Sequence, residues 1–200
     1  MFTMVFRFLL IAALVTAHPV FASEGGGGNE GGGRGDNLNT NTLNASTTGR
    51  VVDILTRGFG KCKRLPRIYR YDCYWKTYKK ASDVLRGSLV YSEAHKAISG
   101  VEDTLRLVVR NNVDPSKKPV RRGLNTYRAI HEAAIPEAKA RTERAMDQAQ
   151  TVLLRAPDNK QTHFARIADA VNSNKVLLRS ALLPGGLLRF AWHLMQLRPV

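Results

Sequence analysis

Two cysteines that lie eleven positions apart, Cys62 and Cys73, limit how this chain can fold more than any other feature. On one continuous helix their Cα atoms would be about 16 Å apart, whereas a disulfide needs Cα atoms within about 7 Å. A bridge therefore requires a turn between them. Pro66 favours one, because the residue before a proline is driven towards an extended conformation and proline suits the first turn of a helix. We predict a disulfide that holds the loop 62–65 against the helix carrying Cys73; the alternative is two free thiols.

The first 22 residues have the layout of a secretory signal peptide. Arg7 supplies the positive charge, and residues 8–17 form an apolar run that is too short to span a bilayer as a helix. Small or β-branched residues precede a cleavage point after Ala22. We expect export to the periplasm or the extracellular space, with an uncleaved membrane anchor as the alternative. An oxidising compartment would favour pairing of the two cysteines.

Glycine and small polar residues dominate residues 23–49. Eight of the 16 glycines of the chain lie between Gly25 and Gly35. A tract with so few apolar side chains cannot bury enough surface to offset the entropy lost on ordering. We therefore expect a flexible linker over residues 23–49 and one folded domain over residues 50–200.

The folded part has the apolar periodicity of helices separated by turn residues. Long helices are predicted over residues 66–86 and 91–112, from Asn125 as cap to about residue 154, and from Asp158 to about residue 183. A kink or break is expected just before Pro136. Residues 51–57 favour neither helix nor strand and are ended by Gly58 and Gly60, and residues 187–197 form a short amphipathic helix. We predict an all-α antiparallel bundle of four main helices plus a short terminal helix.

Basic residues gather in one stretch of the sequence, residues 57–80. This stretch has a single acid, Asp72, and nine basic residues: Arg57, Lys61, Lys63, Arg64, Arg67, Arg70, Lys76, Lys79 and Lys80. A predicted turn adds Lys117, Lys118, Arg121 and Arg122, and Arg128 follows. Residues 23–200 carry 30 basic against 16 acidic residues. Such an excess favours an acidic partner.

Tyrosines are interleaved with the first basic stretch. Tyr69 and Tyr74 fall off the predicted core face of their helix, whereas Tyr71 and Tyr78 lie on it. Exposed aromatic faces among cations would suit a polyanion, because cations meet phosphates while rings stack on bases or sugars. The alternative is that the tyrosines belong to the core and the charges form a solvated rim.

No catalytic or metal-binding motif is complete. His131-Glu132 begins like a zinc-protease helix, but Ile135 occupies the place of the second histidine. We therefore expect no enzymatic activity, no cofactor and no metal. The predicted function is binding of an anionic partner, which could be an envelope polymer, anionic lipid headgroups, a nucleic acid or an acidic protein. The alternative is a structural or protein-interaction module of the envelope without polyanion binding.

The segment Leu187–Leu197 combines leucine, phenylalanine and tryptophan with arginine. This composition is typical of a helix that lies in a membrane interface. A wide apolar stripe is also common on the last helix of a bundle, so we expect a terminal helix that caps the bundle core, with a membrane-surface contact through this segment as the alternative.

Overall fold

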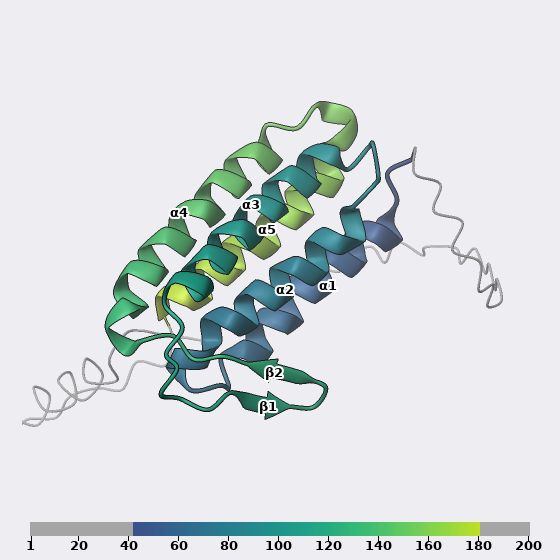
Figure 1. Cartoon of the computed structure of the whole chain (residues 1–200). Helices are drawn as coiled ribbons and strands as arrows, with labels where there is room; N and C mark the ends of the chain where they lie inside the picture. The colour runs from purple at the N-terminus through teal and green to yellow at the C-terminus, as the bar shows by residue number, and fades with distance from the viewer. Residues whose placement is uncertain (1–41, 181–200) are drawn as a thin grey trace, which may run out of the picture. The chain divides into compact units, whose positions relative to one another are not determined.

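The computed structural model describes residues 42–180, which form five α-helices and one β-hairpin (Figure 1). In chain order the helices are α1 (Ala45–Cys62), α2 (Arg70–Leu85), α3 (Ser92–Asn111), α4 (Ile135–Leu154) and α5 (Asp158–Ser180). The strands β1 (Val120–Arg122) and β2 (Asn125–Tyr127) pair between α3 and α4. Single 3-10 turns, Arg67–Tyr69 and Glu132–Ala134, lead into α2 and α4.

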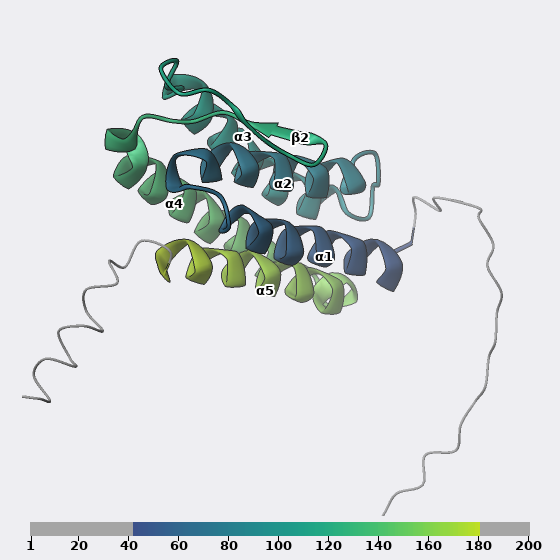
Figure 2. The ribbon, with the colours of Figure 1, turned by 90° about the horizontal axis from the view of Figure 1, so that it is seen from below.

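Each helix packs against the next one in the chain, including α3 against α4, although the hairpin lies between them in the sequence. The last helix, α5, packs against α1 as well. Figure 1 and Figure 2 show that the helix axes lie roughly parallel to one another and that successive helices run in opposite directions. Alternating directions of this kind define an antiparallel bundle. The predicted all-α helical bundle is confirmed, with α1 as a further long helix.

Helix α1 begins inside the segment expected to be a linker. The Asn44 side chain accepts a hydrogen bond of 2.6 Å from the backbone N–H of Thr47 and so caps the helix. Thr48, in the first turn, is fully buried. The expected boundary at residue 50 is therefore wrong, because the ordered domain already includes the helix from Ala45.

Two glycines that we expected to end this element lie within α1. A Cβ atom at Gly58 would be 2.6 Å from Cγ2 of Thr77 on α2. The missing side chain thus lets α1 and α2 approach closely. Burial of Leu55 and Phe59 on the same helix outweighs the roughly 1 kcal/mol that a glycine costs inside a helix.

Residues 120–127 form a hairpin where we expected a turn followed by a helix. Arg122 pairs with Asn125, which leaves Gly123 and Leu124 as a two-residue turn. Gly123 has a φ of +58°, as the first position of a type II′ turn requires. The prediction that Asn125 caps a helix is wrong, because this local turn chemistry prevails.

Helix α4 starts at Ile135, with Pro136 in its first turn. Proline is tolerated there because its missing N–H would have no partner within the helix. The predicted break before Pro136 is thus confirmed, and the predicted start ten residues earlier is not.

The apolar periodicity that predicted α3 and α5 corresponds to one buried face on each. On α3 the buried residues include Ala94, Ile98, Val101, Leu105 and Val108, and on α5 Phe164, Ile167, Val171 and Leu178. The signal peptide at 1–22, linker residues 23–41 and the amphipathic segment 187–197 lie outside the described residues.

Candidate anion-binding site

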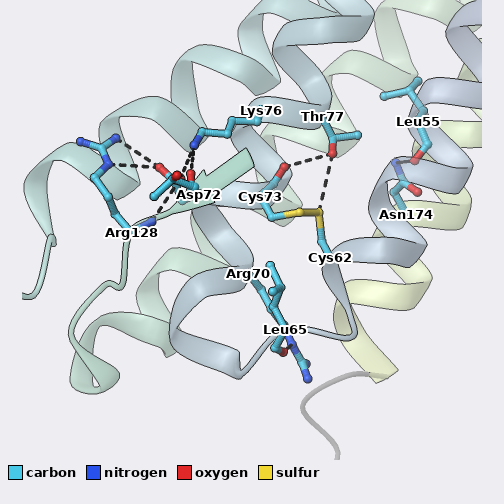
Figure 3. Close-up of a disulfide and its surroundings, with 11 residues drawn as sticks. Leu55, Cys62, Leu65, Arg70, Asp72, Cys73, Lys76, Thr77, Arg128 and Asn174 are labelled. Carbon is cyan, nitrogen blue, oxygen red and sulfur yellow. Dashed lines mark hydrogen bonds and ion pairs between the residues drawn. A yellow bond between two sulfur atoms is a disulfide. The ribbon is translucent and has the colours of Figure 1, made fainter. Parts of the chain in front are cut away.

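The disulfide predicted from the sequence is present (Figure 3). Cys62 is the last residue of α1, Cys73 lies in the first turn of α2, and their Cα atoms are 5.5 Å apart. The turn between them is closed in part by Arg70, whose Nε donates a 2.8 Å hydrogen bond to the carbonyl of Leu65. The bridge therefore fixes the basic loop after α1 against α2. A disulfide of this kind is typical of exported proteins.

The only acid of the first basic stretch is buried. Asp72 has no exposed surface, and its carboxylate accepts from both Lys76 Nζ, at 3.0 Å, and Arg128 Nη2, at 3.2 Å. The backbone N–H of Arg128 donates to it as well, at 3.3 Å. Figure 3 shows the two cations on either side of the carboxylate. Because Lys76 comes from α2 and Arg128 follows β2, Asp72 ties the two basic regions of the sequence together.

Further contacts hold the hairpin against the bundle. Lys76 donates to the carbonyl of Thr126 and lies 5.1 Å from the ring centroid of Tyr127. The backbone N–H of Ile130 donates to the carbonyl of Ile68, at 2.9 Å. Burial and the nearby Asp72 carboxylate raise the pKa of Tyr127. The hairpin is thus fixed along α2 rather than extended into solvent.

A hollow of about 680 Å³, here called the main hollow, opens between the hairpin and the disulfide-linked helices. It is lined by Lys61, Arg64, Leu65, Cys73, Arg122, Gly123, Leu124, Asn125 and Tyr127. Three of these side chains are cationic and none is acidic. Within the described residues, Lys61, Arg64 and Arg122 form no ion pair. The hollow therefore has cationic side chains that no carboxylate neutralises.

A second hollow of about 380 Å³ adjoins the first and shares Lys61, Cys73, Asn125 and Tyr127 with it. It adds Arg57, Lys76 and Lys80 and one acid, Asp53. Asp53 is paired with Arg57, at 2.7 Å, and Lys76 with Asp72. Lys80 is exposed. The two hollows form one cationic surface over α1, α2 and the hairpin.

Burial overturns the expectation for Tyr69 and Tyr74. Their exposed fractions are 8% and 1%, so neither ring is free to stack on a ligand. Tyr74 stacks on Phe59 at a centroid distance of 3.9 Å, and the Tyr69 hydroxyl donates to the carbonyl of Lys118. The 3-10 turn before α2 rotates Tyr69 inward, and the wide contact of α2 with both α1 and α3 covers Tyr74.

The structure separates the other predicted cations by role. Arg128 is engaged by Asp72 and lies over the Trp75 ring, and half-buried Arg70 is bound to the Leu65 carbonyl. Neither lines the hollows. The remaining predicted site residues lie outside the linings as well: Lys63, Arg67, Lys117, Lys118 and Arg121. Of the predicted set, Lys61, Arg64 and Arg122 are brought together.

Sequence reasoning missed Leu124, Asn125 and Tyr127 as lining residues. Arg121 and Thr126 pair on one face of the hairpin, and alternation places Arg122 with Asn125 on the opposite face. A glycine followed by one residue, between strand-forming residues, is the pattern of a type II′ hairpin. Gly123-Leu124 between Val120 and Tyr127 carried that signal.

Buried phenols make the protein sensitive to alkaline pH. Burial raises the pKa of Tyr74 to about 12, and burial also raises the pKa values of Tyr71 and Tyr78. The unfolded chain ionises its tyrosines near pH 10. The free energy of unfolding should therefore keep its full value below about pH 10 and fall as the pH rises towards about 12. Tyr74 alone accounts for at most about 3 kcal/mol of this loss.

Urea unfolding followed by circular dichroism between neutral pH and about pH 11.5 measures this loss. Tyr74→Phe is the matched control, because the Tyr74 hydroxyl has no hydrogen-bond partner among the described residues. The variant should match the parent at neutral pH and lose less stability at high pH. A parent protein that is equally stable at about pH 8 and pH 11.5 would contradict the prediction.

Within residues 42–180 no three metal-ligating side chains gather, and no helix is long and apolar enough to cross a membrane. No known family model, curated protein or solved structure matches the chain. What the site binds is therefore inferred from its own side chains.

Proposed function

We propose that this protein binds an anionic partner in the main hollow, outside the cytoplasm, without catalysing a reaction. The observation that carries the proposal is the convergence of Lys61, Arg64 and Arg122 on one hollow whose lining has no acid. Lysine and arginine donate hydrogen bonds to phosphate, sulfate and carboxylate groups, and such charge-assisted bonds are the stronger class. The signal-like N-terminus and the disulfide support export to the periplasm or the extracellular space.

The three cations come from different parts of the chain. Lys61 belongs to the last turn of α1, Arg64 to the loop fixed by the disulfide, and Arg122 to the end of β1. Holding like charges together is unfavourable unless a counter-ion binds. The disulfide and the Asp72 contacts fix the segments that bear them, so the repulsion is not relieved by a simple movement of the backbone. An anion in the hollow would relieve it.

Charge reversal tests the proposal. The triple variant Lys61→Glu, Arg64→Glu and Arg122→Glu should weaken binding to heparin, DNA and anionic vesicles at least about tenfold at low salt. The matched control is Arg110→Glu, Arg144→Glu and Arg166→Glu, which makes the same change of net charge at exposed positions outside both hollows. The control should lose affinity only about threefold or less, because it alters the long-range field alone.

Titration at about 0.05 M and about 0.5 M salt completes the experiment, since screening shortens electrostatic reach at the higher concentration. Binding should fall steeply with salt. If the parent binds none of the three probes at low salt, the proposal is rejected. If both triple variants lose affinity equally, net charge rather than the hollow is responsible. Capture of an envelope protein that persists at about 0.5 M salt would favour the interaction-module alternative.

A further inference from the structure

The tip of the hairpin exposes a leucine among cations. Leu124 is 95% exposed, the highest value for a large apolar side chain in the described part of the chain. It is not among the apolar residues that pack against the core. The type II′ turn needs glycine at its first position, Gly123, and makes no such demand for an apolar residue at the second. The fold itself therefore gives no reason for leucine at this position.

The charged residues near Leu124 in the sequence are all basic. No acid lies between Asp114 and Glu132, whereas this segment contains Lys117, Lys118, Arg121, Arg122 and Arg128. Leu124 also lines the main hollow together with Lys61 and Arg64. The apolar tip and the unpaired cations thus belong to one surface. Figure 1 shows the tip extending beyond the strands at the edge of the bundle.

We propose that the anionic partner is a lipid bilayer, and that the hairpin docks on it with Leu124 inserted at the boundary between headgroups and acyl chains. This inference rests on the proposed anion binding and names its partner. Cations at the level of the headgroups with an apolar side chain below them are the pattern of interfacial membrane binding. The strength of this mode depends on the apolar area buried and on attraction to anionic lipids, and Leu124 contributes to the first while the basic surface contributes to the second.

Hydrated polyanions fit the tip less well. A nucleic acid strand or a sulfated polysaccharide offers no apolar layer to a leucine, and single-stranded nucleic acids are bound largely through stacking on exposed aromatic rings. Tyr69 and Tyr74 are buried, and Tyr127 is half-buried beneath Lys76. Among the described residues that line the two hollows, only Tyr127 has a ring, whereas a single-stranded nucleic acid stacks successive bases on several.

Leu124→Asn tests the inference in residues 23–200, the chain without its predicted signal peptide. Asparagine keeps the turn and the charge but removes the apolar side chain. Cosedimentation with phosphatidylcholine vesicles containing phosphatidylglycerol should show about tenfold weaker binding than the parent, equivalent to about 1.4 kcal/mol. Leu89→Asn is the matched control, because Leu89 is 74% exposed but lies in the connection between α2 and α3. The control should bind vesicles as the parent does.

Parallel titrations with heparin and DNA separate the two proposals. Unchanged heparin and DNA binding by Leu124→Asn, together with weakened vesicle binding, supports insertion. Equal vesicle binding by Leu124→Asn and the parent overturns the inference. Segment 187–197 is identical in the variants and the parent, so it cannot cause a difference in vesicle binding between them. Binding of the parent to heparin or DNA but not to vesicles also overturns it and leaves the proposed anion binding intact. Absence of binding to all three probes rejects the anion binding itself.

Discussion

Replacing both Lys76 and Arg128 with methionine should lower the free energy of unfolding by about 3–5 kcal/mol. Asp72 has no exposed surface, and these two side chains are its cationic partners. Methionine retains much of the apolar stem of each residue, so the carboxylate stays covered while both positive charges are lost. The backbone N–H of Arg128 remains as a donor, which is insufficient compensation for a buried charge.

The control for this prediction removes the charge that the double variant leaves unpaired. Asp72→Asn in the Lys76→Met, Arg128→Met background should recover most of the lost stability, because a neutral amide costs less to bury than a carboxylate. Urea unfolding of the three proteins gives the comparison. A double variant that loses less than about 1 kcal/mol, or a triple variant no more stable than the double, would show that the Asp72 contacts contribute little.

The same variants report on the hairpin. Lys76 and Arg128 connect α2 to β2 and to the residue after it. In the double variant the hairpin should detach more often from the bundle, so trypsin should cleave after Arg121 and Arg122 sooner than in the parent. Proteolysis at low protease concentration follows the population of such open states. Rescue by Asp72→Asn should be incomplete in this assay, since the amide does not restore the ion pairs.

Helical periodicity predicted α3 and α5 well because each presents one apolar face to a single core. α1 was harder to predict. Its glycines resemble a helix end, but Gly58 serves the close approach of α1 to Thr77, which lies nineteen residues further along the chain and which no local pattern reveals. Its first turn also lies in a polar tract, where Asn44 provides the cap and the buried Thr48 contacts Tyr91 across the bundle.

The excess of basic residues at the candidate site could be predicted from the sequence, but the arrangement of these residues in space could not. Clustering along the sequence did place Lys61, Arg64 and Arg122 among the predicted site residues. Whether they share a hollow depends on the hairpin, which was mistaken for the start of a helix. Assignment of Tyr74 to an exposed face assumed that α2 buries a single stripe, whereas α2 packs against α1 on one side and α3 on the other. A helix between two neighbours buries a wider surface than periodicity suggests.

Removing the disulfide by Cys62→Ala and Cys73→Ala should lower the free energy of unfolding by about 3 kcal/mol. The bridge closes a short loop, so most of the effect comes from the greater freedom of the unfolded chain. Both cysteines are buried, and the Cys62 sulfur lies 3.6 Å from the Thr77 hydroxyl, so alanine also leaves some packing unfilled. Urea unfolding of the double variant against the parent measures the loss.

Reduction distinguishes the covalent bond from the packing. A reductant should destabilise the parent by a similar amount and leave the double variant unchanged, because the sequence contains no cysteine besides Cys62 and Cys73. A stability difference below about 1 kcal/mol would mean that the turn at Pro66 is held by packing and by the Arg70 contact alone.

The bridge should also affect binding, because it fixes the segment that carries two of the three unpaired cations. Lys61 precedes Cys62, and Arg64 follows it in the loop held against α2. Without the bond this segment gains freedom that binding must remove again, so affinity for heparin should fall several-fold under conditions where the protein stays folded. Arg122, held on the hairpin by contacts that do not involve the cysteines, should keep its contribution. Reversal of Arg122 in the double variant should therefore weaken binding further, whereas equal affinities would show that the disulfide stabilises the fold without organising the site.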